Sequence, residues 1–342
     1  MTDATVPILS PLDDAPIRTP WQLARRRFRK NLLAIVGSVL LILLLLACFG
    51  SLPYTLAKSP GASVARYEDQ HNLGHVFEPP SAHIMWVQHS YRVNRWIVTY
   101  WTATTRGFFM GTDRLGRDLF ARFLLGGAIS LSLGLAAAAI AVAIGTGVGL
   151  VSGYVGGRTD ATLMRIVDVL YGLPYILLVI LLRVAMVPIL AQFMDSRWAN
   201  ALILLIGIGG ISWLTMARVV RGQVLSLRDQ PFVEAARAMG FSNRRILLRH
   251  ILPNLVGPIL VYATLTVPQA ILAESFLSFL GLGIQEPLPT WGSLASEGIA
   301  VLNPIRIYWW LILWPCVGLS ATLLCLNFVG DGLRDALDPK SR

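Results

Sequence analysis

Charged residues are scarce in this chain: they make up 14% of its 342 residues, whereas hydrophobic residues make up 55%. A soluble protein of this length needs far more polar surface, so the composition excludes an ordinary soluble domain and predicts a membrane protein. Lysine is the scarcest cation, with Lys30, Lys58 and Lys340 among 29 basic residues. None of the three stands in the phosphate-binding pattern G-x-x-x-x-G-K-[ST], so we expect no ATP-binding loop of this kind.

Cysteine is also rare. Cys48, Cys316 and Cys325 all lie in apolar runs and form no C-x-x-C pair, which argues against a disulfide framework or a thiolate metal site. His71 and His75 could share a helix face as metal ligands, but no carboxylate or cysteine motif completes a site. We therefore expect no metal site and no cofactor in this chain.

The net charge of +10 raises the alternative of nucleic-acid binding. The arginines, however, cluster beside apolar segments and do not form a basic domain. This pattern is typical of charges that fix membrane topology against the cytoplasmic leaflet. The lipid bilayer is the expected partner, and nucleic acid is not.

Six apolar segments meet or approach the length of about 20 residues that a bilayer-spanning helix needs. The expected spans are 31–52, 128–154, 161–187, 198–217, 255–280 and 305–329. Gly145, Gly149 and Gly153 follow one another at four-residue spacing in the second span, which lets another helix approach closely. Pro174 predicts a kink in the third.

The basic cluster at 25–30 precedes the first span and places the N-terminus in the cytoplasm. A cleaved signal peptide is the alternative, but the apolar run is long and five spans follow it, so we interpret it as a retained anchor. With six spans, both termini are expected in the cytoplasm, which fits the arginine-rich inward loop at 218–254.

The expected organisation has five parts. These are a cytoplasmic N-terminal segment (1–30), a first transmembrane anchor (31–52), an extracytoplasmic loop with an interfacial helix (53–127), a five-helix core that includes the loop 218–254 (128–330), and a cytoplasmic tail (331–342). The interfacial helix is expected at 111–125, where Leu115, Leu119 and Phe123 share one face and arginines occupy the other. Arg165 and Asp168, three residues apart in the third span, are expected to pair with each other or with lipid headgroups.

The loop 218–254 contains the most informative segment. Pro231 suits the first turn of a helix and Gly240 suits its end, so a short helix is expected from Pro231 to Met239. Phe232, Ala235, Ala236 and Met239 would form an apolar knob beside Glu234 and Arg237, which a partner groove could accept. Without further information this is an ordinary amphipathic helix in a cytoplasmic linker.

A longer pattern favours a specific function. Glu-Ala-Ala, then Gly, then Leu-Pro occur in the register of the EAA loop of ABC importer permeases, at Glu234, Ala235, Ala236, Gly240, Leu252 and Pro253. His250 occupies a position that is aliphatic in the pattern. The segments GTDRLGRD (111–118), SFLSFLGLG and PLPTWG (within 275–292) also resemble the peptide and nickel permease family, in its second permease type, and the resemblance covers about residues 20–340.

This resemblance implies an all-α polytopic membrane protein with six transmembrane helices in the MetI-like permease fold of the inner membrane. It implies a second homologous permease subunit, two ABC ATPase subunits that bind ATP and Mg²⁺, and an extracytoplasmic solute-binding protein. The residues Phe232, Glu234, Ala235, Ala236, Arg237, Met239 and Gly240 would receive the ATPase stroke. The implied solutes are di- or oligopeptides, with nickel or another small solute as the alternative.

Glu274 is the strongest ionisable candidate inside a span. One hypothesis places it on the outer translocation pathway, where it attracts a peptide amino terminus; the other gives it a hydrogen bond between helices or to the partner permease. Two other function classes lack their sequence signals. A membrane-embedded enzyme would need motifs such as H-E-x-x-H or G-x-S-x-G, which are absent, and an ion-driven transporter would usually show inverted repeats and intramembrane charge relays.

Overall fold

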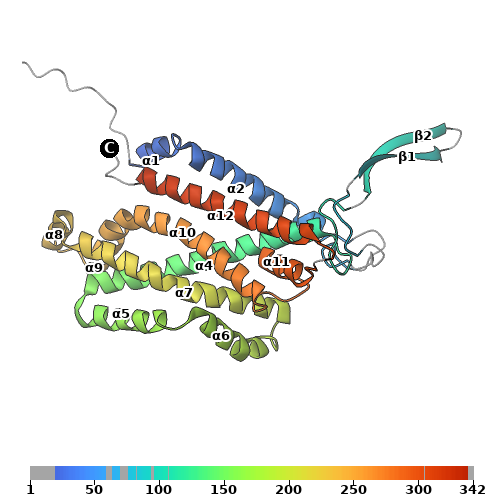
Figure 1. The fold of residues 1–342 in the computed structure, drawn as a ribbon. Helices are drawn as coiled ribbons and strands as arrows, with labels where there is room; N and C mark the ends of the chain where they lie inside the picture. The colour runs from blue at the N-terminus through green and yellow to red at the C-terminus, as the bar shows by residue number, and fades with distance from the viewer. Residues whose placement is uncertain are drawn as a thin grey trace, which may run out of the picture.

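The computed structural model describes residues 20–58, 64–69, 76–81, 83–93, 96–106, 108–303 and 305–337. Helices make up nearly all of this part of the chain (Figure 1). The bounds of the helices are α1 Pro20–Phe28, α2 Leu32–Gly50, α3 Leu52–Thr55, α4 Leu119–Val155, α5 Gly157–Tyr171, α6 Tyr175–Leu190, α7 Ser196–Arg228, α8 Pro231–Ala238, α9 Asn243–Ile246, the π-helical turn η2 Leu247–Ile251, α10 Leu252–Phe279, α11 Trp291–Ala300 and α12 Trp309–Leu337.

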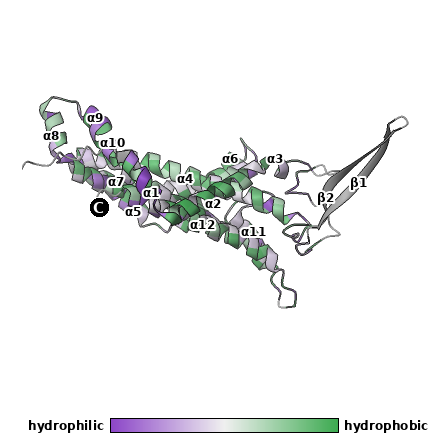
Figure 2. Ribbon diagram, turned by 90° about the horizontal axis from the view of Figure 1, so that it is seen from above, coloured by the Kyte–Doolittle hydropathy of each residue, from purple (hydrophilic) through white to green (hydrophobic). Residues whose placement is uncertain are grey.

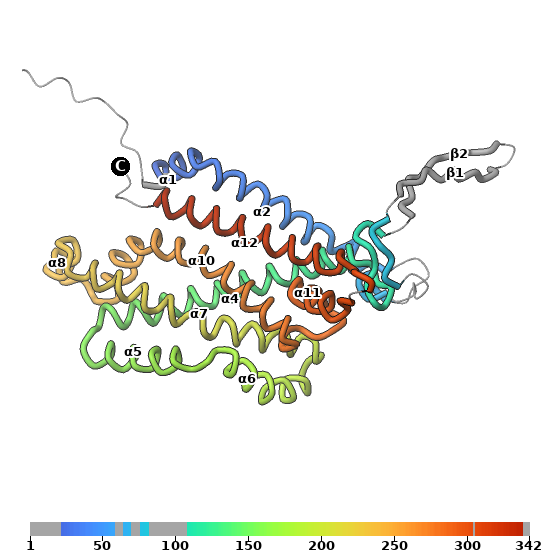
Figure 3. Tube along the Cα trace, viewed as in Figure 1, coloured from blue at the N-terminus to red at the C-terminus, as the bar shows by residue number. Residues whose placement is uncertain are grey.

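Five helices of the described chain are long and apolar enough to cross a membrane, and the bent pair α5–α6 makes a sixth span if it is counted as one. The predicted multi-pass helical fold is thus confirmed. In Figures 1 and 3, α4, α7 and α10 form the middle of the bundle, with α12, α2 and α1 on one flank and α5 and α6 on the other. Hydrophobic residues colour the length of this bundle in Figure 2, and hydrophilic residues gather near α1 and α9.

The glycines at four-residue spacing bring α4 and α7 together, as the sequence predicts. A Cβ atom added at Gly145 would lie 2.6 Å from Met216, one at Gly149 would lie 2.6 Å from the Ala217 carbonyl oxygen, and one at Gly153 would lie 2.8 Å from Val224. Each distance is too short for a real side chain. The two backbones can approach this closely only because these positions lack side chains.

The third span breaks more sharply than a kink. Helices α5 and α6 meet at 87°, with Pro174 capping the start of α6. Of the two expected partners of Asp168, Arg165 is not the one that the structure shows: Arg218 of α7 donates a 2.7 Å hydrogen bond to Asp168 instead. The ion pair therefore joins α5 to the neighbouring α7.

The interfacial helix expected at 111–125 does not form. Residues 111–118 make a tight turn, with Gly111 and Gly116 at φ +85° and +71°, and α4 begins only at Leu119. The carboxylate of Asp118 accepts the backbone N–H of Phe120 and caps the helix. Residues 119–127 thus belong to the long α4, and Arg117 and Arg122 are buried in the protein, whereas Arg114 is exposed.

An antiparallel hairpin, β1 His83–Val93 with β2 Trp96–Arg106, was not foreseen in the all-α prediction. Its register pairs His83 with Arg106 and Val93 with Trp96. It extends from the end of the bundle near α11, whereas α1, α8 and the C-terminal end of α12 lie at the opposite end (Figure 1). Which end faces the cytoplasm stays a prediction.

Candidate functional site

The short helix predicted in the inward loop is present as α8, Pro231–Ala238. Pro231 occupies its first turn. Gly240 adopts φ +77°, a conformation that glycine favours, and its backbone N–H donates to the Arg237 carbonyl at 2.9 Å. Local sequence signals at both ends therefore determine where this helix starts and stops.

The two faces of α8 have different environments. Val233 and Ala236 are fully buried and pack in one cluster with Ile246 and Ile251. On the adjoining face, the side chain of Phe232 is 39% exposed and that of Met239 is 64% exposed. Ala235, Glu234 and Arg237 are exposed as well.

The expected apolar knob is therefore smaller than predicted. Ala236 does not belong to it, because this residue packs α8 against the buried core of the same chain. The outward apolar face consists of Phe232, Ala235 and Met239. We call these three residues the apolar face of α8.

Several contacts tie the α8 region to the ends of the long helices. The guanidinium of Arg237 lies 5.6 Å from the ring centroid of Tyr154, near the end of α4. The hydroxyl of Tyr154 is hydrogen-bonded to the Asn243 side chain at 3.0 Å. The buried cluster also includes Val220 and Val224 of α7 and Leu255 of α10. A displacement of α8 would consequently act on α4, α7 and α10 together.

The outer-pathway role expected for Glu274 finds no surface in this structure. Its side chain is fully buried, and it accepts hydrogen bonds from the hydroxyls of Ser278 (2.7 Å) and Ser130 (3.1 Å). Ser130 belongs to α4 and also accepts the backbone N–H of Trp291, the first residue of α11. Glu274 thus makes the interhelical hydrogen bond of the second hypothesis, and a role on the outer pathway stays a prediction.

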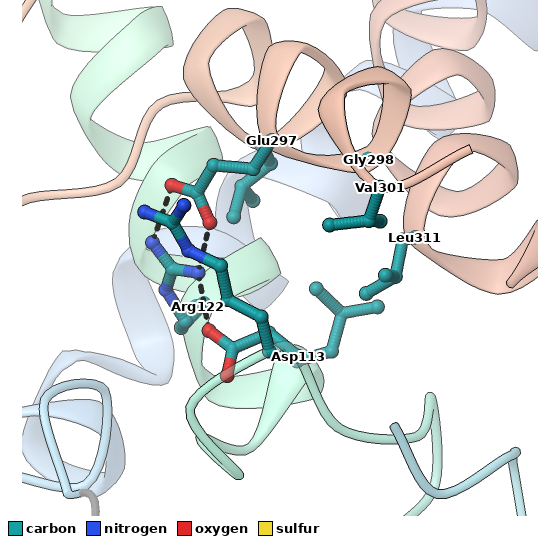
Figure 4. Close-up of a pocket in the computed structure, with 9 residues that line it drawn as sticks. Asp113, Arg122, Glu297, Gly298, Val301 and Leu311 are labelled. Atoms are coloured by element: carbon teal, nitrogen blue, oxygen red, sulfur yellow. Dashed lines mark hydrogen bonds and ion pairs between the residues drawn. The ribbon is translucent and has the colours of Figure 1, made fainter. Parts of the chain in front are cut away.

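A second buried polar cluster was missed by the sequence reasoning (Figure 4). Arg122 donates to Asp113 at 2.7 Å and to both carboxylate oxygens of Glu297 at 2.6 and 2.9 Å. Arg117 donates to Asp113 at 2.6 Å. Both arginine side chains are only 1% exposed. Asp113 and Arg117 belong to the GTDRLGRD segment, but their partner Glu297 lies on α11, where no local pattern marks it.

Glu286 lies at the exposed edge of this cluster. Arg114 donates to it at 3.0 Å, and Arg117 lies 3.5 Å away. Burial alone would raise the pKa of Glu286, but the nearby charges of Arg117, Arg122 and Arg114 lower it below its ordinary value. The charges in the cluster compensate one another, which is what permits two arginines to be buried.

Within the described residues, no group of three His, Cys, Asp or Glu side chains could hold a metal ion. His71 and His75 lie outside the described residues. The buried clusters around Glu274 and Arg122 both join α4 to α11, and α8 lies at the other end of the molecule (Figures 1 and 3). The arrangement suits mechanical coupling between two ends of a helical bundle.

Comparison with known proteins identifies the family. Residues 145–342 match the family described as "Binding-protein-dependent transport system inner membrane component", and residues 19–80 match the "N-terminal TM domain of oligopeptide transport permease C". An inward-facing structure of the MetNI methionine ABC transporter shares the fold, with a TM-score of 0.50 and 19% identity over 64% of this chain and 98% of that chain.

Curated relatives span nearly the whole chain. The oligopeptide transport system permease protein OppC of Haemophilus influenzae is 42% identical and covers 95% of this chain and 90% of its own length. OppC of Escherichia coli K12 is 43% identical over 95% of this chain and 93% of its own. The dipeptide transport system permease protein DppC of Bacillus subtilis is 42% identical over 93% and 85%. The chain therefore belongs to the family of binding-protein-dependent transport system inner membrane components, as a multi-pass ABC transporter permease.

Proposed function

We propose that this chain is a permease subunit of an ATP-driven importer of di- or oligopeptides. The names of its relatives support the solute class, because they describe oligopeptide, dipeptide and glutathione transport. The chain pairs with a second homologous permease and receives peptide from an extracytoplasmic solute-binding protein. Two separate ATPase subunits bind ATP and Mg²⁺, so this chain itself is not an enzyme.

In this proposal α8 receives the ATPase stroke. The observation that carries the proposal is its two-sided packing: Val233 and Ala236 are fully buried, while Phe232 and Met239 on the adjoining face remain exposed. Burial of exposed apolar side chains in the groove of a partner stabilises the complex. The buried side, in turn, fixes α8 to α7 and α10, so a force applied by the partner reaches the spans.

Glu234 and Arg237 flank the apolar face of α8 and are both exposed. Charged residues at the rim of an interface contribute to orientation and specificity more than to affinity. Gly240 contributes through its backbone conformation and not through a side chain, because φ +77° lets the chain turn directly after α8. The seven residues named from the motif thus divide into docking, rim and anchoring positions.

The proposal is tested by co-purification from the native membrane. Ala235→Arg places a long charged side chain in the apolar face of α8. Ala161→Arg makes the same change at an exposed position of α5, near the same end of the molecule. We expect the wild type and Ala161→Arg to retain two ATPases and a second permease, whereas Ala235→Arg loses the ATPases and keeps the permease.

Peptide uptake is measured in parallel in the same strains. Uptake should require the wild-type α8 and should fail in Ala235→Arg. Retention of both ATPases by Ala235→Arg would refute the coupling role. Wild-type membranes that take up no peptide, although all subunits are assembled, would refute the solute class.

A further inference from the structure

The break between α5 and α6 borders a cavity of about 540 Å³. Its other walls come from the central part of α7 and from α10. In Figures 1 and 3 the break lies beside the middle of α7, well away from both ends of the bundle. The volume falls within the range of about 300–1,000 Å³ that is typical of ligand-binding pockets.

The cavity is lined by apolar residues and five neutral polar ones. The polar residues are Tyr171, Tyr175, Ser212, Thr215 and Gln269. None of its lining residues in the described chain is charged, and none is a histidine or cysteine. The lining thus offers hydrogen-bond donors and acceptors without a fixed charge.

Gln269 needs a polar neighbour at this depth. It lies 10 residues before the end of α10, or about 15 Å along the helix axis, which is near the middle of a bilayer. Its side chain is exposed, and among the described residues the side chains of Gln269 and Thr215 make no hydrogen bond. An amide facing hydrocarbon without a partner would cost several kcal/mol, so these groups are expected to face water or a solute.

The rim of the cavity also carries no net charge. The guanidinium of Arg218 lies 4.2 Å from the ring centroid of Tyr171, and its charge is compensated by Asp168 at 2.7 Å. Arg218 thereby holds the Tyr171 ring at the rim. Tyr171 remains 54% exposed, although Arg218 covers one face of its ring.

We propose that this cavity is a solute-contact site that binds the main-chain amides of a passing peptide and is indifferent to the charge of its side chains. Main-chain N–H and C=O groups are matched by the Gln269 amide and the Thr215 hydroxyl. The Ser212 hydroxyl donates to the Ile208 carbonyl at 2.8 Å and can still accept a main-chain N–H. A bare nickel ion would need nitrogen, sulfur or carboxylate ligands, which this lining lacks. The inference rests on the proposed peptide-importing function.

The test introduces a charge where the cavity has none. Uptake of Ala-Lys-Ala and Ala-Glu-Ala at saturating concentration is measured for the assembled importer, and the ratio of the two rates is normalised to the wild-type ratio. Gln269→Glu should slow Ala-Glu-Ala relative to Ala-Lys-Ala, and Gln269→Lys should reverse the order, each by about tenfold. A purely structural role for Gln269 would not produce opposite shifts.

A matched control and a second measurement complete the design. Thr266→Glu and Thr266→Lys change a neighbouring position of α10 that does not line the cavity, and should leave the ratio unchanged. Gln269→Leu should slow tri-alanine, Ala-Lys-Ala and Ala-Glu-Ala alike, about fivefold to tenfold, with normal co-purification of the ATPases.

The possible failures are distinguishable. If the wild type takes up none of the three peptides, the proposed function fails. If the wild type transports them and the Gln269→Glu and Gln269→Lys variants keep the wild-type ratio, only the cavity proposal is overturned.

Discussion

Arg122 of α4 and Glu297 of α11 form a two-point ion pair with N–O distances of 2.6 and 2.9 Å, although 175 positions separate them in the sequence. Such a bidentate pair fixes both distance and orientation. Because Arg122 also donates to Asp113, it links α4, α11 and the turn at 111–118 at one point.

Removal of either Arg122 or Glu297 should therefore lower the stability of the folded protein. We expect Arg122→Met to destabilise the protein by about 3–5 kcal/mol, because it removes the two-point partner of Glu297 and one of the two arginines that pair with Asp113. Thermal unfolding of the purified complex measures the effect. The double variant Arg122→Met/Glu297→Met should lose less than the sum of the single variants; additive losses would show that the pair acts as two independent charges.

The contact between α4 and α7 gives a matched pair of substitutions. Gly149→Ala would place its Cβ 2.6 Å from the Ala217 carbonyl oxygen, whereas Gly147→Ala would meet nothing within 4 Å. We expect the first to cost about 1–3 kcal/mol by overpacking and the second to be neutral or slightly stabilising, since alanine favours helix. Equal unfolding temperatures for the two variants would contradict the close packing.

Glu274 should matter for stability and not for solute choice. In Glu274→Leu the hydroxyls of Ser278 and Ser130 lose their acceptor, at an expected cost of about 1–3 kcal/mol. Glu274→Gln keeps a carbonyl oxygen and should retain both uptake and the range of transported peptides. A changed peptide range in Glu274→Gln would restore the pathway role.

The lowered pKa of Glu286 predicts a pH-dependent contribution to stability. Since the pKa in the folded protein lies below the ordinary value of 4.5, the ionised Glu286 stabilises the fold above about pH 4.5. The contribution is lost as the pH falls below this value and the carboxylate is protonated. We expect Glu286→Gln to unfold at a lower temperature than the wild type at pH 7, and the difference to shrink below pH 4.5.

The control for this experiment is Arg114→Gln, which removes the exposed partner of Glu286. It should reduce the same pH-dependent difference without abolishing it, because Arg117 and Arg122 remain. A difference between the wild type and Glu286→Gln that is constant from pH 3.5 to 7 would show that Glu286 acts by packing and not by its charge.

The sequence predicted a structural feature correctly where a single residue or a short spacing determines it. Pro231 and Gly240 determine the ends of α8, Pro174 determines the break after α5, and the glycine spacing predicts the contact face of α4. In each case the conformational preference of one residue type decides the outcome.

The prediction was wrong where contacts with residues distant in the sequence determine the local conformation, the pairing or the burial of a residue. The alternating charges at 111–125 have the period of an amphipathic helix, but ion pairs with a distant α11 stabilise a turn with Gly116 at positive φ. Asp168 is close in sequence to Arg165, yet the partner that reaches it comes from α7. Ala236 fits an exposed knob by periodicity, but it is buried in a cluster that includes Ile246 and Ile251. No pattern along the chain encodes these pairings.

The π-helical turn at Leu247–Ile251 lies between α8 and the whole of α10. A π turn holds one more residue than an α-helical turn, and each residue of an α-helix turns the chain by about 100°. The turn therefore sets the rotational phase of α10: with one residue fewer, the side of α10 that carries Gln269 would turn away from the cavity, and Glu274 would turn away from Ser130 of α4. The spacing between α8 and α10 thus determines which side chains of α10 face α4 and the cavity.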